Sequence, residues 1–88
     1  MSAYSEVSAA ASGKVVFSDY LQGYGQTIII DHLDGYFSIY SNVSRRFAKF
    51  GDNIPQGQMI AKLDNQNPVL HFEIRRGSDS QNPLYYLP

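Results

Sequence analysis

The stretch NPVLHFEIRR at positions 67–76 places three side chains that could do chemistry at alternate positions. Side chains of a β-strand point to opposite faces with a period of two, so His71, Glu73 and Arg75 should share one face of a strand. We expect this face to border a groove or solvent, and the apolar residues between them to be buried. An imidazole, a carboxylate and a guanidinium could together bind a metal, transfer a proton or bind a partner.

The chain has too few candidate ligands to support a metal site or a zinc-dependent catalytic site. A zinc hydrolase needs about three protein ligands and a position for water, whereas this chain has two histidines and no cysteine. His32 follows an apolar run next to a turn, where a hydrogen bond to the backbone is the expected role. Val69 stands two residues before His71, so a paired-histidine motif is missing. Glu73 is the one carboxylate on the groove strand, and its expected role is an ion pair with Arg75 or with a residue of a neighbouring strand.

Length and composition narrow the possible functions further. The 88 residues fit one small domain, and seven Lys and Arg balance eight Asp and Glu. This balance gives no basic field, and we expect no nucleic-acid partner. No apolar run reaches the length of a membrane span, and the N-terminus lacks the pattern of a signal peptide. The chain should be either cytoplasmic or a piece of a longer exported protein.

Turn residues divide the chain into short strands, and no apolar pattern of period 3.6 lasts long enough for a helix. We therefore predict an all-β, antiparallel fold of about six or seven strands. The main strands are expected at 13–21, 27–32, 36–44, 59–63 and 67–76. Alternation in the third of them places Tyr40 and Asn42 on one polar and aromatic face, opposite Val43. The expected core includes Ile28, Ile30, Phe37, Ile39, Leu70, Phe72 and Ile74.

Several segments, in order, resemble the LytM or lysostaphin-type zinc metallopeptidase domain from about Val7 to the end. They are SAAASGKVVFSDYLQGYGQTIIIDHLDGYFSIYSNVS, GDNIPQGQMIAK and LHFEIRR followed by NPLYYLP. The resemblance implies a small, barrel-like antiparallel sheet of the duplicated-hybrid-motif type, N-terminally truncated. Residues 1–88 would form a single degenerate LytM-like domain, the C-terminal part of a longer exported protein.

The resemblance also implies that the zinc site is incomplete. Active members hold the metal with an upstream H-x-x-x-D motif, absent from this sequence, and with the second histidine of H-x-H, which aligns with His71. The first histidine of H-x-H aligns with Val69, and the histidine of a Y-x-H-x-S motif aligns with Asn42. Neither replacement can transfer a proton near neutral pH. We therefore expect no catalysis, no cofactor and no tightly bound zinc.

Degenerate domains of the EnvC and NlpD type activate cell-wall amidases, and the segments FSDYLQGYGQ and EIRR are similar to the EnvC pattern. The resemblance implies a periplasmic or extracytoplasmic regulator of N-acetylmuramoyl-L-alanine amidases in cell division, with the amidase, and peptidoglycan, as partners. The former active-site groove would bind the partner. The expected groove residues are Tyr40, Asn42, Val69, His71, Glu73 and Arg75.

Two alternatives stay open at this point. The first is a zinc metalloendopeptidase of peptidoglycan whose missing ligands lie outside this chain. The second is an adaptor barrel of the lipoyl or biotinyl type, because GDNIPQGQMIAKL resembles a strand segment of those carriers. Such carriers present the modified lysine in a tight turn, whereas Lys62 is expected inside a strand, which disfavours this alternative.

Overall fold

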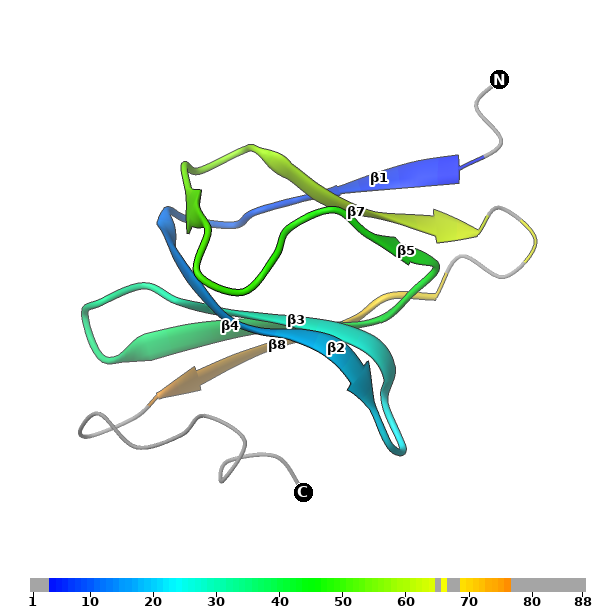
Figure 1. The fold of residues 1–88 in the computed structure, drawn as a ribbon, viewed down its shortest axis with the longest axis horizontal. Helices are drawn as coiled ribbons and strands as arrows, with labels where there is room; N and C mark the ends of the chain where they lie inside the picture. The colour runs from blue at the N-terminus through cyan, green and yellow to red at the C-terminus, as the bar shows by residue number, and fades with distance from the viewer. Residues whose placement is uncertain (1–3, 65, 67–68, 77–88) are drawn as a thin grey trace.

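The computed structural model describes residues 4–64, 66 and 69–76, which form eight β-strands and no helix (Figure 1). No helix in this part of the chain could cross a membrane. The all-β prediction is confirmed, with two two-residue strands among the eight. The strands are β1 (Tyr4–Ser8), β2 (Gly13–Leu21), β3 (Gly25–Asp31), β4 (Tyr36–Val43), β5 (Arg45–Arg46), β6 (Asn53–Ile54), β7 (Met59–Asp64) and β8 (His71–Arg76).

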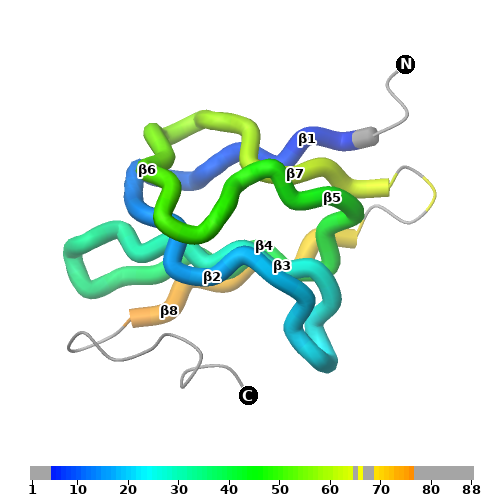
Figure 2. Tube along the Cα trace, viewed as in Figure 1, coloured from blue at the N-terminus to red at the C-terminus, as the bar shows by residue number. Residues whose placement is uncertain are grey.

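The strands form two antiparallel sheets. One has the order β1-β7-β5 and the other has the order β6-β2-β3-β4-β8. Figures 1 and 2 show β1, β7 and β5 together on one side of the larger sheet. Lys62 lies within β7, where it is opposite Glu6 of β1 and Arg45 of β5. A lysine in the middle of a paired strand does not occupy the hairpin turn that a lipoyl or biotinyl carrier needs.

Glycine turns connect the strands of the larger sheet as the sequence predicts. Gly23 adopts a φ of 88° between β2 and β3, Gly25 adopts 82° at the start of β3, and Gly35 adopts 92° between β3 and β4. Positive φ is accessible to glycine without a steric penalty. The chain reverses tightly at both places, so β2, β3 and β4 are consecutive neighbours.

The main core lies between the two sheets. It is a cluster of buried apolar side chains from the facing surfaces: Val7, Ala9, Val15, Ile28, Ile30, Tyr40, Val43, Ala48, Ile54, Ile60, Ala61 and Leu63. A smaller cluster of Ile29, Phe37 and Ile39 occupies the opposite face of the larger sheet. Consecutive residues of β3 are therefore buried on both faces, as in a central strand of a two-sided sheet.

The expected burial of β8 is partly wrong. Leu70 packs against the main core, but Phe72 and Ile74 are 45% and 52% exposed. Their alternation is as predicted, because the register places Phe72 opposite buried Tyr40 and Ile74 opposite buried Ser38. The physical reason for their exposure is position: β8 is the edge strand of the sheet and pairs, among the described residues, with β4 alone.

A β-bulge in β4 also corrects the predicted faces. Gln26 pairs with Val43 and Thr27 pairs with Ser41, so Asn42 is an extra residue without an opposite partner in β3. A bulge interrupts strict alternation. Val43 consequently joins Tyr40 in the main core, although alternation alone placed these two side chains on opposite faces.

Candidate partner-binding groove

An open hollow of about 470 Å³ lies where the bulge of β4 meets the start of β8. Its lining combines polar and aromatic groups from three parts of the chain: Tyr24, Ser41, Leu70, His71, Phe72 and Glu73. His71 and Glu73, two of the predicted groove residues, are thus brought together. The hollow is positioned by the β2–β3 turn, which carries Tyr24, and by the pairing of β4 with β8.

Asn42 and Val69 are in direct contact at this end of β8. The Asn42 side chain donates a hydrogen bond from Nδ2 to the Val69 carbonyl oxygen at 2.6 Å, across 27 positions of sequence. The Asn42 backbone has a φ of 64°, a region in which asparagine and histidine are enriched among non-glycine residues. Its amide N–H donates to the Tyr24 carbonyl oxygen at 3.0 Å. The side-chain amide of Asn42 therefore holds the segment that leads into β8.

His71 lies opposite Ser41 in the register of β4 and β8. The Ser41 hydroxyl donates to the His71 carbonyl oxygen at 3.4 Å, a long hydrogen bond between neighbouring strands. The His71 residue is exposed, so its imidazole is accessible to a partner. Its strand neighbours on the same face are Glu73 and Arg75.

Glu73 and Arg75 form the ion pair that the sequence predicts. Arg75 Nη2 donates to Glu73 Oε1 at 2.9 Å. The Arg75 side chain is 32% exposed and the Glu73 side chain is 37% exposed. Arg75 Nε is buried and, among the residues that the structure describes, has no hydrogen-bond acceptor. Partial exposure limits the stabilisation from such a pair to about 0–1 kcal/mol. The pair therefore does more to orient the guanidinium than to stabilise the fold.

Tyr40 is not part of the groove, and this prediction is wrong. The residue is 1% exposed and belongs to the core between the sheets. Its hydroxyl accepts a hydrogen bond from the Ala10 backbone N–H at 2.9 Å, and its ring lies 5.2 Å from the ring of Phe72. The register places Tyr40 opposite Ile28 and Phe72, on the face of the larger sheet that packs against the smaller sheet, whereas His71 lies opposite Ser41 on the other face.

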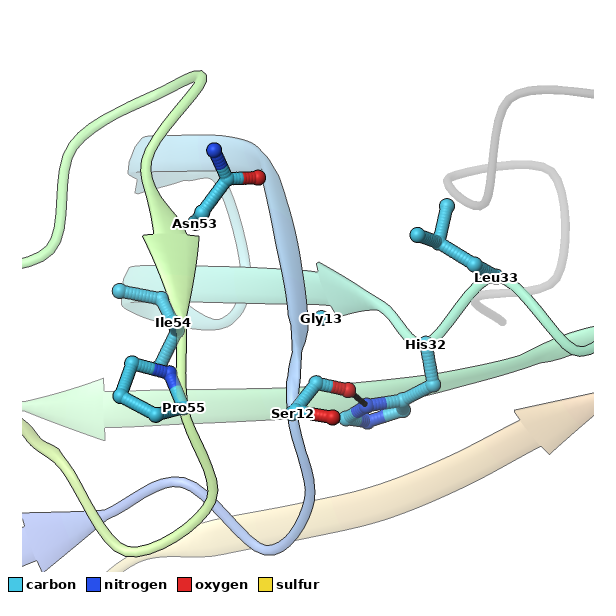
Figure 3. Close-up of a pocket in the computed structure, with 7 residues that line it drawn as sticks. All are labelled: Ser12, Gly13, His32, Leu33, Asn53, Ile54 and Pro55. Carbon is cyan, nitrogen blue, oxygen red and sulfur yellow. Dashed lines mark hydrogen bonds between the residues drawn. The ribbon is translucent and has the colours of Figure 1, made fainter.

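A second hollow of about 400 Å³ surrounds His32 at the other end of β3 (Figure 3). Here His32 Nδ1 lies 2.7 Å from the Ser12 carbonyl oxygen and Nε2 lies 2.8 Å from Ser38 Oγ. A carbonyl oxygen can only accept, so Nδ1 carries the proton of the neutral ring and Nε2 can accept from the Ser38 hydroxyl. The predicted backbone-bonded role of His32 is confirmed, and both ring nitrogens are engaged.

The side chains at the groove do not fit the zinc site that the family resemblance implies. In the described part of the chain, no three His, Cys, Asp or Glu side chains come together as metal ligands. His32 belongs to a different hollow from His71. A tetrahedral zinc site needs about three protein ligands in one place, and the groove offers His71 and the ion-paired Glu73.

Sequence reasoning missed Tyr24 as a groove residue. In the sequence, the segment GYG marks only a turn between two predicted strands. The sequence feature that could have indicated Tyr24 is the next residue, Gly25, whose backbone with positive φ lies against the bulge at Asn42 in β4. A Cβ atom added there would lie 3.7 Å from the Asn42 Cα atom.

Comparison with known proteins agrees with this arrangement of strands. The profile described as "Peptidase family M23" matches residues 1–83. The chain is 36% identical over 86 residues to "Murein hydrolase activator EnvC" of Escherichia coli, an alignment that covers 93% of this chain and 20% of EnvC. It is 40% identical over 84 residues to "Murein hydrolase activator NlpD" of the same bacterium, covering 91% and 22%. The chain thus spans about a fifth of the length of these relatives.

A solved structure is similar over nearly the whole chain. The catalytic domain of lysostaphin from Staphylococcus simulans has a TM-score of 0.76 and 28% sequence identity, covering 98% of this chain and 72% of that one. The all-β, two-sheet architecture is therefore shared with a peptidase, while the relatives with higher sequence identity include proteins named as activators.

Proposed function

The chain belongs to peptidase family M23, and from this membership we propose that it is a non-catalytic, LytM-like module that activates N-acetylmuramoyl-L-alanine amidases. The names of its relatives EnvC and NlpD as murein hydrolase activators support this function. An amidase is the proposed partner, and the proposed location is the periplasm or another extracytoplasmic part of the envelope. Peptidoglycan is a proposed second partner.

The single observation that carries the proposal is the contact between Asn42 and Val69. The resemblance assigns these two positions to the histidines that assist catalysis in active members, and the 2.6 Å hydrogen bond from Asn42 Nδ2 to the Val69 carbonyl oxygen supports one shared site. An amide nitrogen that donates to a carbonyl oxygen has no proton to transfer near neutral pH, and valine has no titratable group. The former catalytic positions thus carry a structural contact.

Partner binding at the groove is supported by the groups that it presents. Tyr24 and His71 line the hollow, and Arg75 extends the same face of β8 with a guanidinium oriented by Glu73. Aromatic and arginine side chains are common anchors of protein interfaces. Arg75 offers a planar set of donors that suits a carboxylate or carbonyl group of the amidase.

The second candidate function is a zinc endopeptidase whose remaining ligands come from outside this chain. It is favoured by His71 at a family ligand position and by the similarity to the lysostaphin catalytic domain. The replacements at Asn42 and Val69 argue against it, because additional ligands would not restore the assisting histidines. We propose accordingly that the chain needs no cofactor.

The experiment is a peptidoglycan-release assay with an amidase from the same genome and the variant Arg75→Ala. The variant should keep its thermal stability, because the exposed ion pair contributes about 0–1 kcal/mol, and it should lose most of the stimulation. The matched control is Arg45→Ala, since Arg45 is exposed on the smaller sheet and lies 5.7 Å from the Phe47 ring. Normal stimulation by folded Arg75→Ala protein would refute this groove function.

A further inference from the structure

Arg46 connects the two sheets through its guanidinium. It belongs to β5 of the smaller sheet, where it pairs with Ala61 of β7. Its side chain reaches the larger sheet: Nε donates to Gln26 Oε1 of β3 at 2.6 Å, and Nη1 donates to Ser18 Oγ of β2 at 2.8 Å. Hydrogen bonds from a charged donor are shorter and stronger than those between neutral groups. One planar guanidinium thus holds two strands of the larger sheet from the smaller sheet.

Both acceptors suit this role. The Ser18 hydroxyl donates its proton to the Ala48 carbonyl oxygen at 2.6 Å, which leaves the lone pairs of its oxygen for Arg46. Gln26, Ser18 and Arg46 are all partly buried. Water competes less for such bonds than at an open surface, so they hold the side chains in a defined arrangement.

Gln26 lies where the bulge of β4 meets the turn that carries a groove residue. It pairs with Val43, directly after the bulge residue Asn42. Two positions before Gln26, Tyr24 lines the groove, and its carbonyl oxygen accepts a hydrogen bond from the Asn42 backbone N–H at 3.0 Å. A bond that holds Gln26 therefore also holds both partners of this contact.

These contacts form a closed circuit around the bulge. From Asn42 the main chain leads to Arg46, whose side chain bonds to Gln26. The chain then leads back from Gln26 to Tyr24, which is bonded to Asn42. Asn42 has a φ of 64°, a conformation that persists where the surrounding contacts determine it. The bond from Arg46 supplies such a contact, because it closes the circuit.

We propose that Arg46 is a positioning residue of the groove, which holds Asn42 and Tyr24 in the arrangement that a partner recognises. The described lining of the groove does not include Arg46, so it acts through Gln26 and not by touching the partner. The consequence for activation rests on the proposed function of the groove. The effect on the bulge is a property of the chain itself and can be measured without an amidase.

The test is amide hydrogen exchange of the chain, measured by NMR, because exchange reports local opening of single hydrogen bonds. The measured quantity is the protection of the Asn42 amide divided by that of Ile39, which is buried in the middle of β4. Arg46→Met keeps an unbranched side chain, removes the donors and should lower this ratio about tenfold. Arg45→Met is the matched control, since Arg45 is the exposed neighbour with the same charge, and it should leave the ratio unchanged.

Two further variants separate positioning from general stability. Gln26→Met removes the acceptor next to the bulge and should also lower the ratio about tenfold, which keeps the proposal testable if Arg46→Met does not fold. Ser18→Ala removes the other acceptor and should lower the protection of both amides alike. An unchanged ratio in folded Arg46→Met or Gln26→Met protein overturns the proposal. An equally large change of the ratio in Ser18→Ala also overturns it, because Arg46 would then be purely structural.

The amidase assay tests the consequence for recognition. Arg46→Met should raise the concentration needed for half-maximal stimulation about threefold or more, because only chains with an ordered bulge can bind. Stimulation at saturation should equal that of the wild type. A wild-type half-maximal concentration in Arg46→Met protein with a lowered exchange ratio would overturn the role in recognition. A wild-type chain without any stimulation would refute the proposed function, and the exchange ratio would still decide whether Arg46 positions the bulge.

Discussion

Tyr40→Phe tests the corrected position of this side chain, which lies in the core and not in the groove. The variant keeps the ring and removes only the hydroxyl, the acceptor for the Ala10 N–H at 2.9 Å. The bond is only partly buried, since Ala10 is exposed, so its loss should cost about 0.5–1.5 kcal/mol, the usual net contribution of a hydrogen bond. A change of 1 kcal/mol moves the melting temperature of a domain of this size by about 4–8 °C. We therefore expect Tyr40→Phe to melt about 2–12 °C below the wild type.

The assay is thermal and urea unfolding followed by circular dichroism, with Tyr36→Phe as the matched control. Tyr36 lies on the same strand but is 41% exposed, so loss of its hydroxyl should change the free energy of unfolding by less than about 0.5 kcal/mol. Amidase stimulation by folded Tyr40→Phe protein should equal that of the wild type, because the hydroxyl faces the interior. Wild-type stability combined with lost stimulation would refute the reasoning and return Tyr40 to the binding surface.

Three further variants test the backbone at the site and at the start of β2. Asn42→Ala should lower the free energy of unfolding by about 1–3 kcal/mol, because it loses the hydrogen bond to the Val69 carbonyl oxygen and strains a residue with a φ of 64°. Asn42→Gly loses the same hydrogen bond without the strain and should cost roughly 1 kcal/mol less. Equal urea midpoints for the two variants would argue against a strained backbone. Gly13→Ala should cost about 1–3 kcal/mol, because an added Cβ would lie 2.5 Å from the Asp31 carbonyl oxygen, and an unchanged melting temperature would contradict that close approach.

The long strands of the larger sheet were predictable because turn chemistry defines their ends. The segment 13–21 coincides with β2, and the glycines at 23, 25 and 35 mark the connections on either side of β3. The short strands β5 and β6 have two residues each. Two residues carry no periodic pattern, so such strands are defined by their pairing partners and not by local sequence.

The candidate site was predictable only in part, because both errors depend on the tertiary arrangement of the strands and not on spacing within one strand. Spacing alone placed His71, Glu73 and Arg75 on one face, since β8 is regular. Tyr40 was misplaced because both faces of β4 are buried, and the register puts Tyr40 on the face toward the smaller sheet, opposite Ile28 and Phe72. The exposure of Phe72 depends on which strand ends the sheet, which is a property of the tertiary arrangement.

The central claim is that the groove binds a partner amidase and does not catalyse peptidoglycan cleavage. Release of dye from labelled peptidoglycan tests this claim most directly. The chain is assayed alone, with added zinc, and together with an N-acetylmuramoyl-L-alanine amidase from the same genome, and its metal content is measured after chelator treatment and re-equilibration with zinc. We predict no release by the chain alone under either condition, less than one bound zinc per chain, and a strong increase in release by the amidase. Zinc-dependent release by the chain alone, with one zinc per chain and no effect on the amidase, would contradict the account.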